Sequence, residues 1–234
     1  REIDVIIAIG WRYLLPSKIY KTAKKGCYVF HDSCLPEYRG FSPTVWAIRE
    51  GEKYTGISVF KITKKVDEGP ILFQEKVSID NDDYISDVMQ KVTEKCEKLI
   101  KKLYDLIVID NLTFTEQNHL KATYFGKLKP DDFKIDWHNN SQKIFNKIRS
   151  YSYPYPGSFT FFEMKKLYIY SSSIDEMPVT NECTPGTVIN INDEKTITVM
   201  CGDSTALRLK EVSLNSEVII KPKLLIQSIG VRLG

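Results

Sequence analysis

Short apolar runs dominate the first half of the chain and predict the strands of a sheet. The run Asp4–Ile9 is rich in β-branched residues, which is typical of a central parallel strand covered on both faces. Cys27–Phe30 has the same character and predicts a second buried strand. Further strands are expected at Gly56–Ile62, which has period-two character, and at Ile71–Gln74.

Helical patterns separate these runs. Leu15–Tyr20 predicts a short helix with a proline in its first turn, and Thr44–Glu50 predicts another. After the capping residues Asp82 and Asp83, a longer segment keeps its apolar side chains on one face. Those side chains are Ile85, Val88, Met89, Val92, Cys96, Leu99, Leu103 and Ile107. Together these elements predict an α/β fold for residues 1–120.

The pattern of apolar and polar residues changes after residue 117. Asn118–Asp132 contains Gly126 and Pro130 and has no clear periodicity, so we place a domain linker there. A helix is expected at Ser141–Ser150, capped by Asn140 or by Ser141 itself. Short apolar strands then follow at regular spacing, at 158–162, 166–170, 186–191, 196–201 and 206–212. This spacing predicts a small antiparallel β-barrel, which we assign to residues 126–234.

Composition excludes several classes of protein. With 42% hydrophobic residues the chain can bury a core, and its longest apolar run is too short to cross a bilayer. The five cysteines contain no Cys-x-x-Cys pair, which argues against a disulfide framework or a metal site and favours reduced thiols in the cytoplasm. The chain starts at Arg1 and soon enters an apolar strand, so we expect further strands of the sheet to precede it.

Two candidate site segments follow the first two predicted strands. Gly10–Tyr13 follows the first strand, and His31–Ser33 follows the second. Because the ligand crevice of an open α/β sheet lies at the carboxyl ends of its strands, both segments lie where a site would form. Taken alone, a histidine at a strand end is more often structural than catalytic, and Asp67 can simply make a turn.

A series of motifs changes that balance. The motifs of the first half are His31, Ser33, Leu35, Pro36, Tyr38, Arg39 and Gly40, then Pro43, Trp46, Ala47, Ile48, Gly51, Glu52 and Gly56, and finally Val66, Asp67, Gly69 and Ile71. In this order they resemble the formyltetrahydrofolate-dependent formyltransferase family. Segments 122–125, 129–132, 135–137, 154–159, 185–188 and 201–203 resemble the C-terminal barrel of its methionyl-tRNA and sugar-nucleotide branches. The resemblance implies a Rossmann-like catalytic domain followed by an OB-like barrel.

The resemblance also implies a reaction. Moving a formyl group from 10-formyltetrahydrofolate to an amine requires a base, a donor to the developing oxyanion and help for the leaving amine. The catalytic histidine and aspartate of the family correspond to His31 and Asp67, and a carboxylate beside an imidazole favours the imidazolium. Ser33 is either an orienting hydroxyl near the oxyanion or the cap of a turn. The family reaction implies no metal.

One position departs from the family pattern. The family has an asparagine two residues before the histidine, where its amide polarises the formyl oxygen, and this chain has Val29 there. Losing such a donor costs roughly 2.7 to 4 kcal/mol. Three interpretations follow: another group replaces the amide, the protein transfers a different group or none, or a bulge shifts the register. We favour replacement, because the remaining motifs would be needless in an inactive protein.

The resemblance assigns binding roles as well. Gly10, Trp11, Arg12, Tyr13 and Leu14 are similar to the family loop that holds the pterin ring, and the alternative is a strand-to-helix connection with core aromatics. The substrate contacts expected from the resemblance are Asp32, Arg39 and Trp46. Asp32 either alters how the amine is held or is a solvated loop carboxylate.

The acceptor is inferred from motif and charge. Tyr38–Pro43 and Trp46–Ile48 resemble the sugar-nucleotide enzymes more than the methionyl-tRNA enzymes. Residues 125–234 carry 14 Lys and Arg against 12 Asp and Glu, a small excess for a domain that grips tRNA. We therefore predict N-formylation of an amino sugar nucleotide, with methionyl-tRNA formylation and a non-catalytic binding module as alternatives. The barrel is free to pack on another subunit, as in a homodimer, or on a neighbouring domain.

Overall fold

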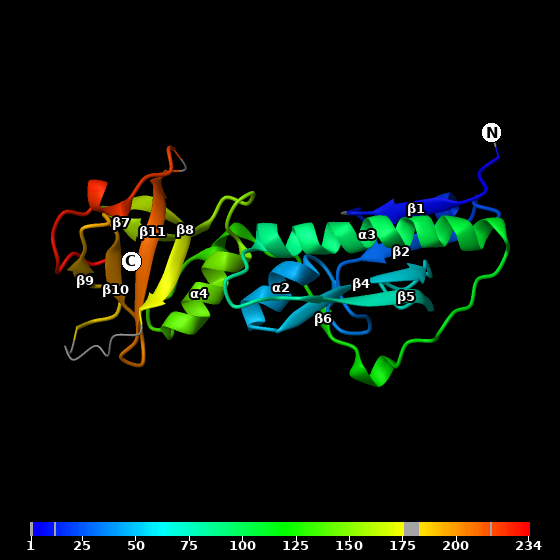
Figure 1. Ribbon diagram of the computed structural model, residues 1–234, viewed down its shortest axis with the longest axis horizontal. Helices are drawn as coiled ribbons and strands as arrows, with labels where there is room; N and C mark the ends of the chain where they lie inside the picture. The colour runs from blue at the N-terminus through cyan, green and yellow to red at the C-terminus, as the bar shows by residue number, and fades with distance from the viewer. Residues whose placement is uncertain (1, 12, 176–182, 216) are drawn as a thin grey trace. The chain divides into compact units, whose positions relative to one another are not determined.

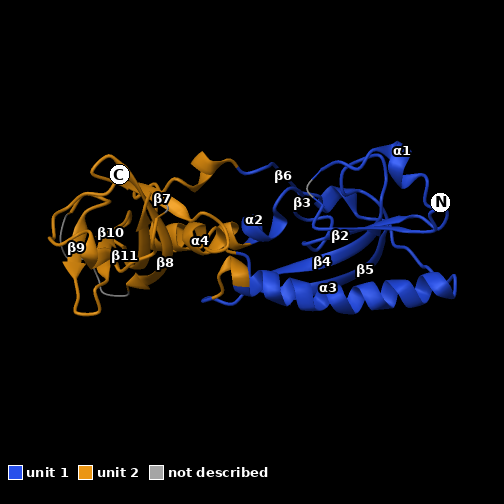
Figure 2. Cartoon of the chain, turned by 90° about the horizontal axis from the view of Figure 1, so that it is seen from above, with its two compact units in different colours: residues 1–47, 52–82, 87–128 blue, residues 48–51, 83–86, 129–234 orange. Residues whose placement is uncertain are grey.

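The computed structural model describes all residues except 1, 12, 176–182 and 216. The chain forms two compact units (Figure 2). Unit 1 comprises residues 1–47, 52–82 and 87–128, and unit 2 comprises residues 48–51, 83–86 and 129–234. No helix among the described residues has the length and apolarity needed to cross a bilayer.

The sheet of unit 1 has four strands in the order β1-β2-β4-β5 (Figure 1). These are β1 (Ile6–Ile9), β2 (Cys27–His31), β4 (Tyr54–Lys61) and β5 (Ile71–Ser78). β1 and β2 run parallel, whereas the β2–β4 and β4–β5 pairs are antiparallel. The predicted α/β class is confirmed, with a mixed sheet that contains one parallel pair.

The first strand was predicted to be central and covered on both faces, and further strands of the sheet were expected to precede it. β1 lies at one edge of the described sheet, and Ile7 and Ile9 remain 40% and 48% exposed. A continuous apolar run is typical of buried parallel strands, but burial requires neighbours on both sides. In the described residues, β2 is the only strand that pairs with β1.

Helix α3 (Ile85–Val108) packs along the sheet of unit 1 (Figures 1 and 2). Lys95 of α3 forms an ion pair with Glu75 of β5, and Lys102 lies over the Phe73 ring, so the helix runs beside β5. Most of the apolar residues predicted for its inner face are buried. Each such side chain contributes about 1.5 to 3 kcal/mol, more than any difference in helix propensity, so this buried face holds the helix in place.

Shorter elements complete unit 1. They are α1 (Ser17–Tyr20), β3 (Arg39–Gly40), the beginning of α2 (Pro43–Glu50), the 3-10 turn η1 (His119–Lys121) and β6 (Tyr124–Phe125). β3 and β6 pair in parallel. This pairing brings residues 118–125, which the sequence suggested as part of a linker, against the segment that follows β2.

Unit 2 is built on a five-stranded antiparallel sheet in the order β7-β8-β11-β10-β9. The strands are β7 (Ser158–Phe162), β8 (Lys165–Asp175), β9 (Val188–Ile191), β10 (Ile197–Met200) and β11 (Ala206–Leu214). A small antiparallel β domain was predicted and is confirmed. The prediction of a closed barrel is wrong. The strands of the described residues form an open sheet, because its edge strands, β7 and β9, do not pair with each other.

Helix α4 (Ser141–Ser150) begins at the predicted cap, since the Asn140 side chain accepts a hydrogen bond from the Lys143 N–H. Its apolar face joins the core of unit 2, with Ile144, Phe145 and Ile148 buried beside residues of the sheet. The 3-10 turns η2 (Pro130–Phe133) and η3 (Pro222–Leu224) complete the unit.

Candidate functional site

His31 is the last residue of β2, and its ring is held in one orientation. The ring is buried, and its Nε2 lies 2.8 Å from the carbonyl oxygen of Tyr38. A carbonyl oxygen only accepts hydrogen bonds, so Nε2 must carry a proton. In the neutral ring this leaves Nδ1 as the basic nitrogen.

Asp67 faces that basic nitrogen. Its Oδ2 lies 3.8 Å from His31 Nδ1, and it accepts a 2.8 Å hydrogen bond from the Gly40 N–H. The Asp67 backbone is in the left-handed region, at φ 52°, a conformation that aspartate tolerates better than most residues. The structure therefore brings together the two residues predicted to be catalytic.

A buried polar network surrounds the Asp67 turn. Gln117 donates from Nε2 to the carbonyl oxygens of Asp67 and Gly69, at 2.9 and 2.7 Å. Its Oε1 accepts from Nε and Nη2 of Arg39, at 3.2 and 2.6 Å. Tyr124 donates from its hydroxyl to Glu68 and accepts from Arg39 Nη1, and its hydrogen bond lowers the pKa of Glu68.

Arg39, predicted to contact the substrate, is held by protein groups. Its side chain is fully buried, and its guanidinium contacts Gln117, Tyr124 and His119. Gln117 is buried as well, whereas Tyr124 and His119 are exposed. The guanidinium is thus engaged by protein partners beside the Asp67 turn, and its contact with a substrate stays a prediction.

Ser33 was predicted either to orient groups at the reaction centre or to cap a turn. Its hydroxyl donates to the carbonyl oxygen of Glu37 at 2.7 Å and is buried, so it caps the turn after β2. Ser58 and Gln74 hold the same turn from β4 and β5. Ser58 Oγ donates to the Ser33 carbonyl, and Gln74 Nε2 donates to the Leu35 carbonyl at 2.8 Å.

Val29 occupies the position where the resemblance led us to expect an asparagine. β2 pairs with β1 and with β4 in unbroken register through this residue, with Ala8 and Phe60 as its partners. A bulge in β2 is therefore excluded as the reason for the mismatch. Side chains alternate along a strand, so Val29 and His31 share one face of the sheet, and no amide is present at position 29.

Asp32 is half-buried, and burial raises the pKa of its carboxyl above the ordinary range, partly opposed by the nearby His31. The alternative of a freely solvated loop carboxylate is therefore wrong. Its backbone carbonyl accepts hydrogen bonds from the hydroxyls of Thr55 and Thr44, at 2.9 and 3.4 Å.

The loop after β1 differs from the segment after β2. In the parallel register Ile9 is paired with Phe30, so Gly10 and His31 follow at neighbouring positions. Trp11, Tyr13 and Leu14 are 59%, 77% and 72% exposed, and Arg12 lies outside the described residues. The alternative of a connection with core aromatics is wrong, because the aromatic side chains of this loop face solvent.

Trp46 lies on α2 within an aromatic group of unit 1. Its ring centroid is 5.0 Å from that of Phe125, and its Nε1 donates to the Gly126 carbonyl. Tyr38 stacks on the same Phe125 ring at 4.6 Å. Trp46 is half-buried, and its contact with a substrate stays a prediction.

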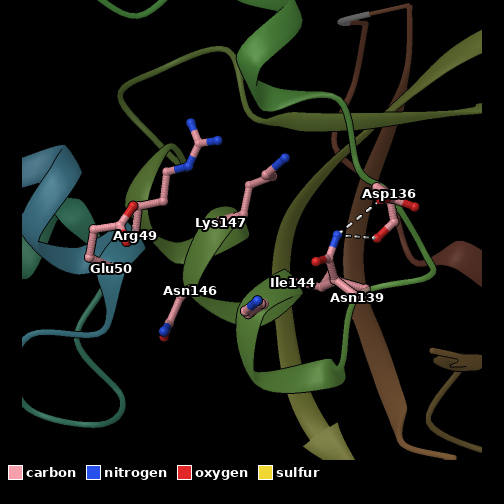
Figure 3. Close-up of a pocket in the computed structure, with 8 residues that line it drawn as sticks. Arg49, Glu50, Asp136, Asn139, Ile144, Asn146 and Lys147 are labelled. Atoms are coloured by element: carbon pink, nitrogen blue, oxygen red, sulfur yellow. Dashed lines mark hydrogen bonds between the residues drawn. The ribbon is translucent and has the colours of Figure 1, made fainter. Parts of the chain in front are cut away.

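Unit 2 contains a separate cavity of about 300 Å³ (Figure 3). Its lining residues are Arg49, Glu50, Asp136, Asn139, Lys143, Ile144, Asn146 and Lys147. Burial lowers the pKa of Lys147, whose Nζ donates to the Lys134 carbonyl. None of the predicted site residues that the structure describes lines this cavity.

Sequence reasoning missed the residues that support the site. Gln117, His119 and Tyr124 lie in or beside a segment without periodicity, and Ser58 and Gln74 look like ordinary polar positions on strands. Only the pairing of β3 with β6 and of β4 with β5 brings them to the turns that they hold.

Two family profiles match this chain. The Formyl transferase profile matches residues 1–103, and the profile "Formyl transferase, C-terminal domain" matches residues 127–229. Bifunctional polymyxin resistance protein ArnA of Wigglesworthia glossinidia brevipalpis is 33% identical over 189 residues, which cover 81% of this chain and 28% of that protein. The chain therefore spans less than a third of the length of this curated relative.

Solved structures share the fold at lower identity. HypX from Aquifex aeolicus in complex with tetrahydrofolic acid has a TM-score of 0.74 at 16% identity, over 95% of this chain and 38% of that one. The N-formyltransferase from Helicobacter canadensis with folinic acid and dTDP-3-aminofucose has a TM-score of 0.63 at 21% identity, over 81% and 68%. Methionyl-tRNA formyltransferase from Clostridium thermocellum has a TM-score of 0.62 at 24% identity, over 74% and 73%.

Proposed function

Because this chain belongs to the formyltransferase family, we propose that it carries the reaction centre of an N-formyltransferase that acts on an amino sugar nucleotide. The formyl donor in this proposal is 10-formyltetrahydrofolate. The observation that carries the proposal is the pairing of His31 Nδ1 with Asp67 Oδ2 at 3.8 Å, while Nε2 is fixed on a backbone carbonyl.

This geometry suits the proton transfers of the reaction. The amine nitrogen attacks the formyl carbon, and its proton passes to His31 Nδ1. The bond from the formyl carbon to folate N10 then breaks, and a proton from the imidazolium reaches N10. Opposite unit charges at about 4 Å attract by roughly 4 kcal/mol at an effective dielectric constant near 20, so the Asp67 carboxylate favours the imidazolium.

The exposed loop after β1 is the proposed folate-binding surface. Trp11 and Tyr13 present their rings to solvent beside the carboxyl end of β2, where a flat pterin ring would contact them. Gly10 adopts φ 59°, which lets the chain turn away from β1 at this point. The solved relatives with tetrahydrofolic acid or folinic acid support a folate ligand for this fold.

The sugar-nucleotide acceptor has support from a solved relative, because the Helicobacter canadensis N-formyltransferase structure holds dTDP-3-aminofucose. The likeness to methionyl-tRNA formyltransferase keeps methionyl-tRNA as the second candidate acceptor. Val29 is the observation that favours a binding module without turnover.

Mass spectrometry of acceptor products tests the proposal. Purified protein containing this chain is incubated with 10-formyltetrahydrofolate and, in separate reactions, with 3-amino and 4-amino sugar nucleotides and with methionyl-tRNA. We expect a mass gain of one formyl group on an amino sugar nucleotide only. Formylation of methionyl-tRNA alone would contradict the proposed acceptor. Transfer to no acceptor by the native chain, but to one of them by Val29→Asn, would support the binding module.

A further inference from the structure

Gln117 is a buried amide whose two ends face different chemical partners. Its Oε1 meets the Nε and Nη2 donors of Arg39, and its Nε2 meets the carbonyl oxygens of Asp67 and Gly69. Arg39 can only donate and the two carbonyls can only accept, so the amide has one satisfactory orientation. Gln117 therefore links the buried guanidinium to the backbone of the Asp67 turn.

That turn has little freedom of its own. A side chain at Gly69 would place its Cβ 1.8 Å from the Lys61 carbonyl oxygen, so the chain approaches β4 closely there. On the other side, the Asp67 carboxylate is fixed by the Gly40 N–H, next to Arg39. The same two segments are thus joined twice, once by the Asp67 side chain and once by Gln117.

We infer that Gln117 is a positioning residue, which holds the Asp67 carboxylate within reach of His31 by bridging Arg39 to the 67–69 backbone. The inference rests on the proposed function for its effect on turnover, but the placement of Asp67 can be measured without any turnover. The hydrogen bonds of Gln117 go to Arg39, Asp67 and Gly69, so its effect on the reaction should pass through Asp67.

The Gly40 N–H reports the placement of Asp67 directly. Its hydrogen-bond acceptor is Asp67 Oδ2, whereas the neighbouring Arg39 and Phe41 N–H groups donate to backbone carbonyls of residues 123 and 125. Its hydrogen exchange therefore measures whether the carboxylate stays in place. A hydrogen bond to a charged acceptor is strong enough that its loss speeds exchange by about tenfold or more.

The test uses Gln117→Glu, which keeps the acceptor for Arg39 and places oxygen against the Asp67 and Gly69 carbonyls. The matched control is Gln227→Glu, at an exposed position of unit 2. We expect exchange of the Gly40 amide to speed up about tenfold or more in Gln117→Glu only. If the glutamate variant does not fold, Gly40 exchange is measured in Gln117→Met, whose side chain is neutral and of similar length. Unchanged exchange at Gly40 in a folded Gln117 variant would overturn the inference.

Turnover gives the second readout. With the acceptor found by mass spectrometry, Gln117→Glu should lower kcat by about tenfold or more and leave KM nearly unchanged. In an Asp67→Asn background it should change kcat by less than about twofold, since the carboxylate is already absent. Additive losses would contradict a role through Asp67. If the native chain transfers no formyl group, the function fails, and the Gly40 exchange alone decides the inference.

Discussion

The segments that follow β1 and β2 start side by side and are built in opposite ways. After β2, the chain from His31 to Gly40 is held by hydrogen bonds: the Leu35 N–H donates to Ser58 Oγ, the Tyr38 N–H donates to Thr123 Oγ1, and Gln74 Nε2 donates to the Leu35 carbonyl. After β1, Trp11, Tyr13 and Leu14 are mostly exposed. The segment proposed for proton transfer is thus formed in advance, whereas the segment proposed to bind folate has most of its surface available to a ligand.

The difference follows from what each segment has to do. Groups that transfer protons must be held close to the productive geometry, because small displacements cost rate. A surface that stacks on a flat aromatic ring needs exposed apolar area, which the protein interior would otherwise bury. We therefore expect substitutions after β2 to change kcat, and substitutions after β1 to change the KM for the folate donor.

The largest effect is expected for His31→Ala. Removal of the proposed base should lower kcat by about 10² to 10⁴, measured as formyl transfer to the identified acceptor. The matched control is His138→Ala in unit 2, where the imidazole is 71% exposed. Comparable rates for His31→Ala and the native chain would remove His31 from the reaction.

Asp67→Asn should have the next largest effect. Asparagine tolerates the left-handed backbone and keeps an oxygen for the Gly40 N–H, so the fold is retained while the charge is lost. We expect kcat to fall by about a hundredfold, because the imidazolium loses its partner. Asp203→Asn is the control, an exposed aspartate at φ 54° that should leave kcat unchanged. Equal kcat values for the two variants would show that the charge of Asp67 is not used.

Trp11→Ala and Tyr13→Ala test the segment that follows β1, which is proposed to bind folate. Both side chains are exposed, so the free energy of unfolding should change by less than about 0.5 kcal/mol. The KM for 10-formyltetrahydrofolate should rise by about tenfold, equivalent to about 1.4 kcal/mol of binding. Tyr153→Ala, at a position 70% exposed in unit 2, should change neither quantity. A lower melting temperature for Trp11→Ala would show that the loop supports the fold.

The smallest effect is expected for Asp32→Asn, measured as unfolding by urea at different pH values. Burial raises the pKa of Asp32 in the folded state, so the native chain loses stability as pH rises from its ordinary value through the raised one. The asparagine variant should therefore be more stable than the native chain at neutral pH, and the gain should disappear at acid pH. Asp82→Asn, at an exposed position, is the control. A gain in stability that does not depend on pH would contradict this account.

Several elements were predictable because their signals are local. The helix α4 begins where Asn140 offers a cap, and β2 follows from four consecutive apolar residues. The neighbours of β1 were not predictable in this way. Its residues form the expected strand, but the sequence pattern does not show which strands lie beside it, and two of its apolar side chains remain exposed.

The residues of the candidate site were likewise only partly predictable from the sequence. His31 and Asp67 were singled out by their place in a motif, and Gly10–Leu14 by their place after a strand. The role of Arg39 was not predictable, because a motif position does not show whether a guanidinium meets a ligand or the protein. Gln117 was not predictable either, since it lies 50 residues from its acceptor Asp67.

The sequence by itself determined the family, the order of the elements and the absence of an amide at Val29, because each of these depends on residue identity and local spacing. The tertiary structure alone decided that β2 has no bulge, that Ser33 caps a turn and that Arg39 is buried beside Gln117. These outcomes depend on hydrogen-bond partners far away along the chain. These partners meet only when the strands of the sheet pair with one another and β3 pairs with β6.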